Sequence, residues 1–280
     1  MSLRSRPGSL VLAGLAVLAL AGFGSGERMF APRAQPWDRW TAHDEAGGTI
    51  DFSAWDRLLA RHVVVSKGRH NQVRYRALAG ADRKGLDAFI DRSAALAVSR
   101  YPRREQFAYW INLYNALTVK VVLDHFPVRS IRDISISPGL FAKGPWGAKL
   151  VTVEGERLSL DDIEHRILRP IWRDNRIHYA VNCASVGCPD LQRSAFTGAR
   201  IDDQLDRAAR DYVNSPRGVS ITGRAITVSR IYDWYIADFG NTEQGVIDHL
   251  LRHARPELAR RIREIGRLDG TAYDWSLNDG

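Results

Sequence analysis

The order of apolar and polar positions predicts helices and short hairpins along most of the chain. Apolar residues that recur every three or four positions, as between Asp51 and His62, indicate helices that face a core. Short apolar runs that flank glycine or asparagine indicate hairpins. We expect helices over 51–62, 86–98, 104–126, 159–168, 201–212, 242–253 and 256–265, hairpins over 63–75, 150–160 and 219–228, and a buried strand over 176–182. This irregular order is typical of a single α+β domain with a mixed or antiparallel sheet, hairpins and a central buried helix.

The helix expected over 104–126 has two apolar faces. Opposite its broad apolar stripe, Asn112 and Asn115 lie among alanines and a valine instead of charged residues. This pattern predicts a second buried face, and buried amides need hydrogen-bond partners. Either the two amides bond to loop carbonyls and fix the fold, or they face a cleft. On the expected strand, His178 and Asn182 share one face, and we expect the two polar sets to face each other.

The helix expected over 159–168 carries Glu164 and His165. Ser159 and Asp162 have the spacing of a capping box at its start. Pro170 is expected to end it, because proline cannot donate the next backbone hydrogen bond.

The first 26 residues differ from the rest of the chain. Arg4 and Arg6 precede an uncharged run over 10–23, and small residues follow it, which predicts a cleavable secretory signal over 1–26. A run of about 14 residues is shorter than the roughly 20 that span a bilayer, so a retained anchor is the minor alternative. We expect an exported protein, periplasmic or extracellular, with no permanent membrane span after cleavage. A linker is expected over 27–48 and the folded domain over 49–280.

Composition and charge exclude several functional classes. The chain is 45% hydrophobic and 26% charged, as in folded soluble proteins. Its net charge falls from +8 to +6 when Arg4 and Arg6 are removed, and the basic residues are scattered among acidic ones. A nucleic-acid partner is therefore not expected, since it requires basic residues gathered on one face. Glycine-rich phosphate loops are absent, which argues against a nucleotide enzyme.

Both cysteines of the chain, Cys183 and Cys188, lie in one segment that begins at His178. In an oxidising compartment they can form a disulfide, if the turn brings their Cα atoms to about 4.4–6.8 Å. Alternatively, one is a reactive thiol that a nearby base activates. A metal site is least supported, because the spacing is not that of a zinc knuckle and no H-x3-H pair is present, so no metal is predicted.

Strand geometry limits the choice of base. On a straight strand His178 and Cys183 point to opposite faces, so they meet only if the chain bends or bulges near Asn182. Glu164 or His165 from the preceding helix are alternative partners for Cys183. A further alternative is that His178 acts on Cys188, which follows the turn.

Several motifs resemble the domain of unknown function 547 family. They occur in the same order and span roughly residues 50–278; the segments are Ala108–Ala116, Leu158–His165, His178–Pro189, Asp233–Gly240 and Tyr273–Asn278. The resemblance implies a single domain and no assigned reaction.

Two functions from different classes remain. The first is an exported thiol-dependent hydrolase or acyl transferase with Cys183 as nucleophile, His178 as base and Glu164 orienting the site. The predicted binding residues are Asn112, Asn115, Asn182, His165 and Cys188. The second is a noncatalytic envelope binding module with a Cys183–Cys188 disulfide. The expected ligand is a small molecule, a peptide or a glycan, and no cofactor is predicted.

Overall fold

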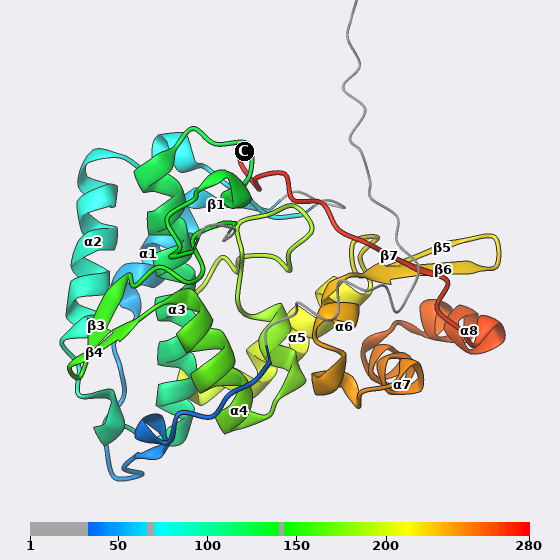
Figure 1. The fold of residues 1–280 in the computed structure, drawn as a ribbon, viewed down its shortest axis with the longest axis horizontal. Helices are drawn as coiled ribbons and strands as arrows, with labels where there is room; N and C mark the ends of the chain where they lie inside the picture. The colour runs from blue at the N-terminus through cyan, green and yellow to red at the C-terminus, as the bar shows by residue number, and fades with distance from the viewer. Residues whose placement is uncertain (1–32, 66–69, 140–142) are drawn as a thin grey trace, which may run out of the picture.

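Helices provide most of the framework (Figure 1). The computed structural model describes residues 33–65, 70–139 and 143–280, so the predicted signal over 1–26 and the start of the linker lie outside the described residues. The helices expected from apolar periodicity are present, although α2 both begins and ends earlier than the expected 86–98; they are α1 (Ser53–His62), α2 (Gly80–Ala94), α3 (Arg103–His125), α5 (Ile201–Val213), α7 (Glu243–His253) and α8 (Pro256–Ile265). Short helical turns connect them; these are η2 (Asp38–Thr41), η3 (Tyr75–Ala77), η4 (Val98–Arg100), η5 (Ile131–Asp133), η8 (Gly198–Arg200), α6 (Ile231–Trp234) and η9 (Ile236–Phe239).

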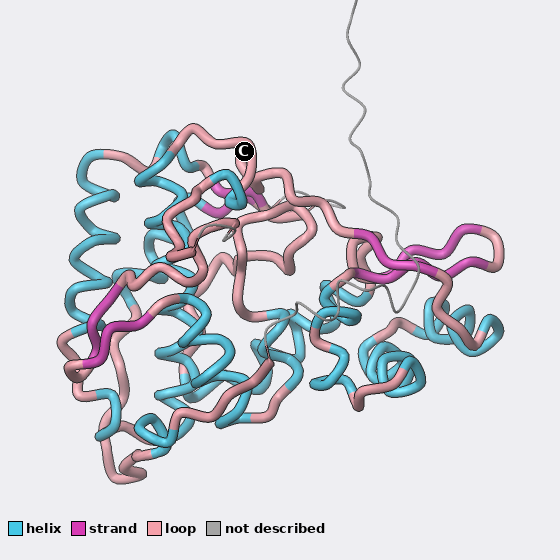
Figure 2. The backbone as a smooth tube through the Cα atoms, in the orientation of Figure 1, coloured by secondary structure: helices cyan, strands magenta, loops and turns pink. Residues whose placement is uncertain are grey.

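In the part of the chain that the structure describes, the strands are short and form three small sheets (Figure 2). The expected hairpins are present as antiparallel pairs; these are β1 (Val63–Val64) with β2 (Gln72–Val73), β3 (Val151–Val153) with β4 (Glu156–Leu158), and β5 (Val219–Thr222) with β6 (Ala225–Ser229). β7 (Gly270–Ala272) pairs with β6 in parallel and makes the third sheet mixed. The α+β class is therefore confirmed. The sequence did not predict β7, because three small residues carry no periodic signal.

The buried apolar residues described in the structure form two cores. The first surrounds α3, which is buried on almost every face, as its two apolar faces predicted. The second lies among α5, α7 and the mixed sheet. Within the expected linker, Trp40 is buried and packs edge-on against Trp110 at 5.0 Å between ring centroids. No helix within the described ranges is long and apolar enough to cross a membrane.

The strand predicted over 176–182 is wrong. The chain forms instead a 3₁₀ helix, η7 (Asn175–Tyr179), followed by irregular backbone. Asp174 accepts a hydrogen bond from the backbone N–H of Arg176 at 2.9 Å, and this cap favours a helical turn. The apolar residues resemble a buried strand because they enter different cores, with Ile177 in the first and Tyr179 in the second. The alternating faces assumed for His178 and Cys183 therefore do not apply.

The helix predicted over 159–168 begins as expected but ends later than expected. The capping box is present, since Ser159 N–H donates to Asp162 Oδ2 at 2.8 Å and Asp162 N–H donates to Ser159 Oγ at 3.1 Å. The helix has wide π turns in η6 (Asp162–Leu168) and continues as α4 (Arg169–Trp172). Pro170 does not end it, since α4 continues through Pro170 to Trp172; the chain leaves the helix at Arg173, whose φ is 50°.

Candidate functional site

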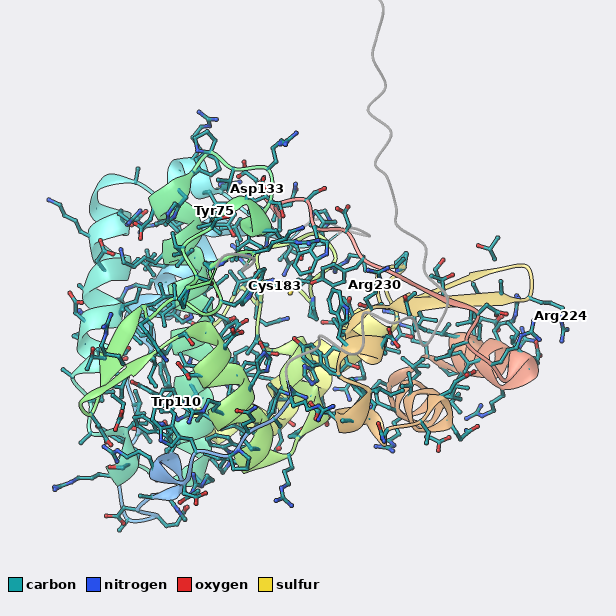
Figure 3. All side chains as sticks on the ribbon, in the orientation of Figure 1. Tyr75, Trp110, Asp133, Cys183, Arg224 and Arg230 are labelled. Atoms are coloured by element: carbon teal, nitrogen blue, oxygen red, sulfur yellow. The ribbon has the colours of Figure 1, made fainter. Side chains whose placement is uncertain are left out.

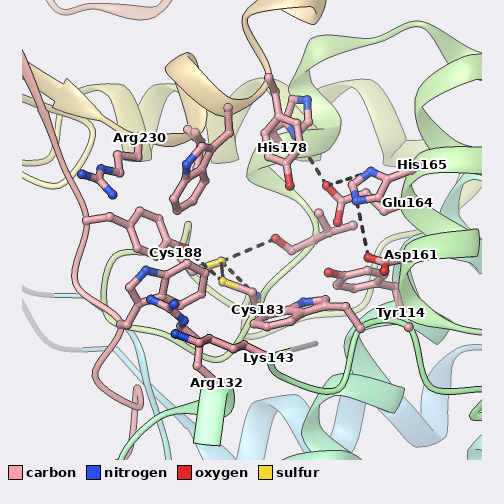
Figure 4. A pocket seen from close by; sticks show the side chains of 18 of the residues that line it. Tyr114, Arg132, Lys143, Asp161, Glu164, His165, His178, Cys183, Cys188 and Arg230 are labelled. Carbon is pink, nitrogen blue, oxygen red and sulfur yellow. Dashed lines mark hydrogen bonds and ion pairs between the residues drawn. The ribbon is translucent and has the colours of Figure 1, made fainter. Parts of the chain in front are cut away.

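A pocket of about 650 Å³ is lined by residues of both cores (Figure 4). Tyr114 of α3 and the first turn of η6 form one wall. The turn that carries Cys183, together with aromatic residues after β6 and β7, forms the other. Figure 3 shows Cys183 between the two groups of helices, so both cores determine the environment of this thiol.

The acidic wall comes from one helical face. Asp161, Glu164 and His165 all line the pocket, at the three- and four-residue spacing of neighbours on a helix. His165 Nε2 lies 3.6 Å from Asp161 Oδ1. Burial and the neighbouring Asp162 raise the pKa of Asp161 to about 6, although Lys149 opposes the shift. Burial and the neighbouring Arg169 hold the pKa of His165 well below its usual value, so His165 is neutral at pH 7.

Glu164 is a buried carboxyl that faces the pocket. Its Oε1 lies 3.8 Å from His178 Nδ1 and 3.9 Å from His165 Nδ1, and the Tyr114 hydroxyl donates a hydrogen bond to it. Burial raises the pKa of Glu164 to about 7, against the opposing effects of Arg169 and Tyr114. Its neutral and ionised forms are therefore both populated near pH 7, as a general acid–base group requires.

His178 is held between two acids and an aromatic ring. Its Nε2 lies 2.7 Å from Asp238 Oδ2, and the ring stacks on Tyr235 at 4.2 Å between centroids. Burial lowers the pKa of His178, although Asp238 opposes the shift. A neutral ring that donates to Asp238 from Nε2 has its unprotonated Nδ1 on the side of Glu164.

Asp238 is shared by two donors. Besides His178, it accepts a hydrogen bond from Arg169 Nε at 2.6 Å. Burial opposes its charge, but His178 and Arg169 outweigh burial and hold the pKa of Asp238 well below its usual range. This carboxylate therefore stays ionised and fixes the orientation of His178.

Cys183 is a half-buried thiol with three polar neighbours. Its Sγ lies 2.9 Å from Cys188 Sγ, 3.0 Å from the Tyr273 hydroxyl and 3.2 Å from Ser185 Oγ. Burial opposes ionisation, but the hydrogen bonds with Cys188, Ser185 and Tyr273 outweigh it and lower the pKa of Cys183 to about 7. Cys188 is buried, and burial together with Cys183 raises the pKa of Cys188 well above its usual value. Cys183 is thus the thiol that ionises first.

The disulfide considered for the two cysteines is absent. Both are free, and their sulfurs are farther apart than the roughly 2.05 Å of an S–S bond. The turn that holds them is fixed by the C-terminal segment, because Gly187 N–H donates to the Asp274 carbonyl and Val186 N–H to the Ser276 carbonyl, both at 2.8 Å. A Cβ added at Gly187 would lie 2.7 Å from the Asp274 backbone nitrogen, so this close approach requires glycine.

Aromatic and cationic side chains surround the thiol side of the pocket. Tyr273 packs against Trp275 at 4.7 Å and against Trp234 at 4.9 Å between centroids. The Arg132 guanidinium lies over the Trp275 ring at 5.0 Å. Figure 4 shows Arg132 and Lys143 on the side of the sulfurs, with Glu164 and Asp161 across the pocket. A ligand therefore meets positive charge and aromatic surface at one side and carboxyl groups at the other.

Five of the residues predicted from the sequence line this pocket together; they are Glu164, His165, His178, Cys183 and Cys188. The three predicted asparagines do not line it. Asn112 donates to the Phe196 carbonyl at 2.8 Å and accepts from the Phe196 N–H at 3.0 Å, in the loop before α5. Asn112 therefore fixes a loop, which was one of the two alternatives for its amide.

The other two asparagines support the cysteine turn from behind. Asn115 donates to the Ala180 carbonyl at 2.9 Å and accepts from the Asn182 N–H at 2.8 Å, so α3 does pack against this segment. Asn182 in turn accepts from the Ala184 N–H at 2.9 Å and donates to the Pro189 carbonyl at 2.7 Å. These amides position the backbone on both sides of Cys183 and do not reach the ligand space.

Other pocket residues were not predicted from the sequence. Tyr114, Asp161 and Tyr235 line the pocket, Tyr273 contacts the thiol, and Asp238 holds His178. The motifs Asp233–Gly240 and Tyr273–Asn278 contain three of them, so a signal was present, but no local pattern relates those motifs to the cysteines. Among residues 33–65, 70–139 and 143–280, no three His, Cys, Asp or Glu side chains are arranged to hold a metal ion.

Comparison with known proteins gives a family without an assigned reaction. The family described as protein of unknown function, DUF547, matches residues 98–213. No curated protein and no solved structure matches the chain. The matched residues include Glu164, His178 and both cysteines, whereas Asp238 and Tyr273 lie beyond them. Residues 98–213 therefore match the DUF547 family, and this part of the chain carries the thiol and the buried carboxyl of the pocket.

Proposed function

We propose that this protein is a thiol-dependent acyl-transfer enzyme, a hydrolase or an acyl transferase, with Cys183 as nucleophile and Glu164 as general acid and base. One observation carries the proposal. A thiol whose pKa is lowered to about 7 and a carboxyl whose pKa is raised to about 7 line the same pocket. Their environments move the two groups in opposite directions, as acyl-transfer chemistry near neutral pH requires.

In the first step, the Cys183 thiolate attacks the carbonyl carbon of an ester, amide or thioester. A new S–C bond forms, and neutral Glu164 gives its proton to the leaving atom as the old bond to carbon breaks. The product is a thioester on Cys183 and an ionised Glu164. The hydrogen bonds of Ser185 and Tyr273 to the thiol sulfur keep the thiolate available before the attack.

In the second step, ionised Glu164 accepts a proton from the incoming water or acceptor. The oxygen or nitrogen of that molecule attacks the thioester carbon, and Cys183 leaves as a thiolate. Both groups then return to their starting protonation states. With water the protein is a hydrolase, and with an amine or alcohol it is a transferase.

His178 serves this cycle as a positioning residue. Its contacts are with Asp238, Glu164 and Tyr235, and through Nδ1 it faces the carboxyl that exchanges protons. This differs from the sequence hypothesis, in which His178 was the base of Cys183. The supporting observation is that Asp238 occupies Nε2 at 2.7 Å.

We also propose that the protein acts outside the cytosol. The support is the positively charged start with Arg4 and Arg6, followed by the apolar run and small residues of a secretory signal.

The test of the enzymatic proposal uses p-nitrophenyl acetate and the protein kept reduced. We expect a burst of p-nitrophenolate equal to the enzyme concentration, and a mass increase of one acetyl group on the Cys183 peptide. Cys183→Ala should lose both signals. Thr222→Ala, at an exposed hairpin position, is the matched control and should keep them. The enzymatic proposal is rejected in favour of a binding module by either of two results. The first is acetylation that is as fast in Cys183→Ala as in the unmodified protein. The second is that neither p-nitrophenyl acetate nor esters with acyl groups of other sizes give an adduct.

A further inference from the structure

We propose that Cys183 and Cys188 are also a redox-active dithiol, which reduces low-molecular-weight disulfides that carry carboxylate groups. Cys183 is the attacking thiol and Cys188 the resolving thiol. This activity is independent of acyl transfer, although both use Cys183.

The arrangement of the two sulfurs supports the proposal. They lie 2.9 Å apart without a bond, so closing a disulfide requires only a small movement of the side chains. The backbone between them is held in place by hydrogen bonds from Val186 and Gly187 to the C-terminal segment. The turn therefore presents the thiols as a prepared pair in the reduced protein.

The two thiols differ in the way that attack and resolution require. Both thiols line the pocket, but Cys183 is half-buried, whereas Cys188 is only 5% exposed. Hydrogen-bond donors surround Cys183, so near pH 7 it is partly a thiolate, while Cys188 keeps its proton. The Cys183 N–H lies 2.9 Å from Cys188 Sγ and stabilises the charge that develops there when Cys188 reacts.

The reaction balances with the disulfide as oxidant. The Cys183 thiolate attacks one sulfur of R–S–S–R, the S–S bond breaks, and one R–S⁻ leaves and takes up a proton. Cys188 then loses its proton and attacks the Cys183 sulfur of the mixed disulfide, so the second R–S⁻ leaves and is protonated. Two protein thiols have become one disulfide, and one external disulfide has become two thiols.

The pocket indicates the size and charge of this disulfide. A space of about 650 Å³ around a half-buried sulfur admits a small molecule but not the folded surface of a protein. Arg132, Lys143 and Arg230 line the pocket, and Figure 4 shows these cationic side chains around the thiol side. Carboxylate groups close to the attacked sulfur therefore meet favourable charge on the thiol side, whereas ammonium groups at the same place meet like charge.

The test compares glutathione disulfide, which is anionic, with cystamine, which is cationic. The reduced full chain is mixed with each, and intact mass is followed with time. With glutathione disulfide, we expect the chain to lose the mass of two hydrogens without a lasting adduct. Cys188→Ser should instead hold one glutathione on Cys183, and Cys183→Ser should not react. Cystamine should react about tenfold more slowly, the low end of electrostatic effects on such rates.

Clear results would overturn the proposal. A lasting glutathione adduct on the unmodified chain would mean that Cys188 does not resolve it. Reaction of Cys183→Ser at Cys188 with the rate of the unmodified chain would reverse the assigned order. Equal rates with cystamine would remove the substrate class. Cys188→Ala repeats the trapping test if Cys188→Ser unfolds. Acetylation of the reduced chain is measured separately, so loss of disulfide exchange with acetylation intact rejects only this proposal.

Discussion

Replacing Glu164 with glutamine tests whether Glu164 is the general acid and base, because this one change should raise stability and lower activity. Burial raises the pKa of Glu164 from 4.5 to about 7. A pKa raised in the folded state means that ionising this carboxyl destabilises the fold. The cost is absent below about pH 4.5, grows as the pH rises, and is complete above about pH 7. At about 1.4 kcal/mol for each pH unit, it amounts to about 3 kcal/mol.

Glutamine has the shape of glutamate and no charge, so Glu164→Gln removes this cost. We expect the free energy of unfolding of the variant to equal that of the unmodified protein near pH 4.5. At pH 8 the variant should be more stable by up to about 3 kcal/mol. Urea unfolding at the two pH values measures the difference. Glu257→Gln, at an exposed carboxyl of α8, is the control and should show no pH-dependent gain.

In Glu164→Gln, the loss of activity should depend on whether the leaving group of the ester needs a proton. An alkyl ester needs a proton on its leaving oxygen, so its turnover should fall about 10²- to 10⁴-fold. Acetylation by p-nitrophenyl acetate should change little, because p-nitrophenolate leaves without a proton. If Glu164→Gln is less stable at pH 8, the charge of Glu164 is stabilised by Arg169 and the acid role is refuted. Equal losses with both esters would refute it as well.

Four further outcomes are expected. Turnover of an alkyl ester should be highest near pH 7, because it needs both ionised Cys183 and neutral Glu164. The ionised thiol is lost below pH 7 and the neutral carboxyl above it. A flat rate profile from pH 5 to 9 would contradict this. Tyr273→Phe should raise the pH midpoint of alkylation of Cys183 by iodoacetamide by about one unit. Asn115→Ala leaves two backbone groups unpaired and should cost about 2–6 kcal/mol in urea unfolding, at about 1–3 kcal/mol for each group. Sequencing of the protein from its producing cell should find an amino terminus within 25–28, whereas a full-length cytosolic chain would contradict export.

The sequence predicted the helices well because each carries its own periodic signal. α5 and α8 place apolar residues at helical spacing against one core, and no other structure satisfies that pattern. Segment 176–182 failed because its apolar residues serve two cores, which a single-strand pattern cannot represent. Burial in two directions looks the same in the sequence as burial in a sheet.

The site was predictable only where its residues are close in sequence. Glu164 and His165, and likewise His178 and the cysteines, occur in short segments whose chemistry can be read directly. Asp238 reaches His178 over 60 positions, and no local pattern records that contact. The asparagines show the opposite difficulty. The sequence indicated that Asn112 and Asn115 are buried, but not whether their partners are a ligand or the backbone of a loop.

The pocket lies between two cores, and residues of both sides influence the pKa values of Cys183 and Glu164. Cys183 and Glu164, the proposed nucleophile and acid, both lie within residues 98–213, but two groups that adjust their surroundings come from beyond this range. The Tyr273 hydroxyl is hydrogen-bonded to Cys183 Sγ, and Asp238 orients the ring of His178 that faces Glu164. The C-terminal segment therefore acts as the second wall of the site as well as part of the second core. A change there can retune when the thiol ionises while the positions of the thiol and the carboxyl stay the same.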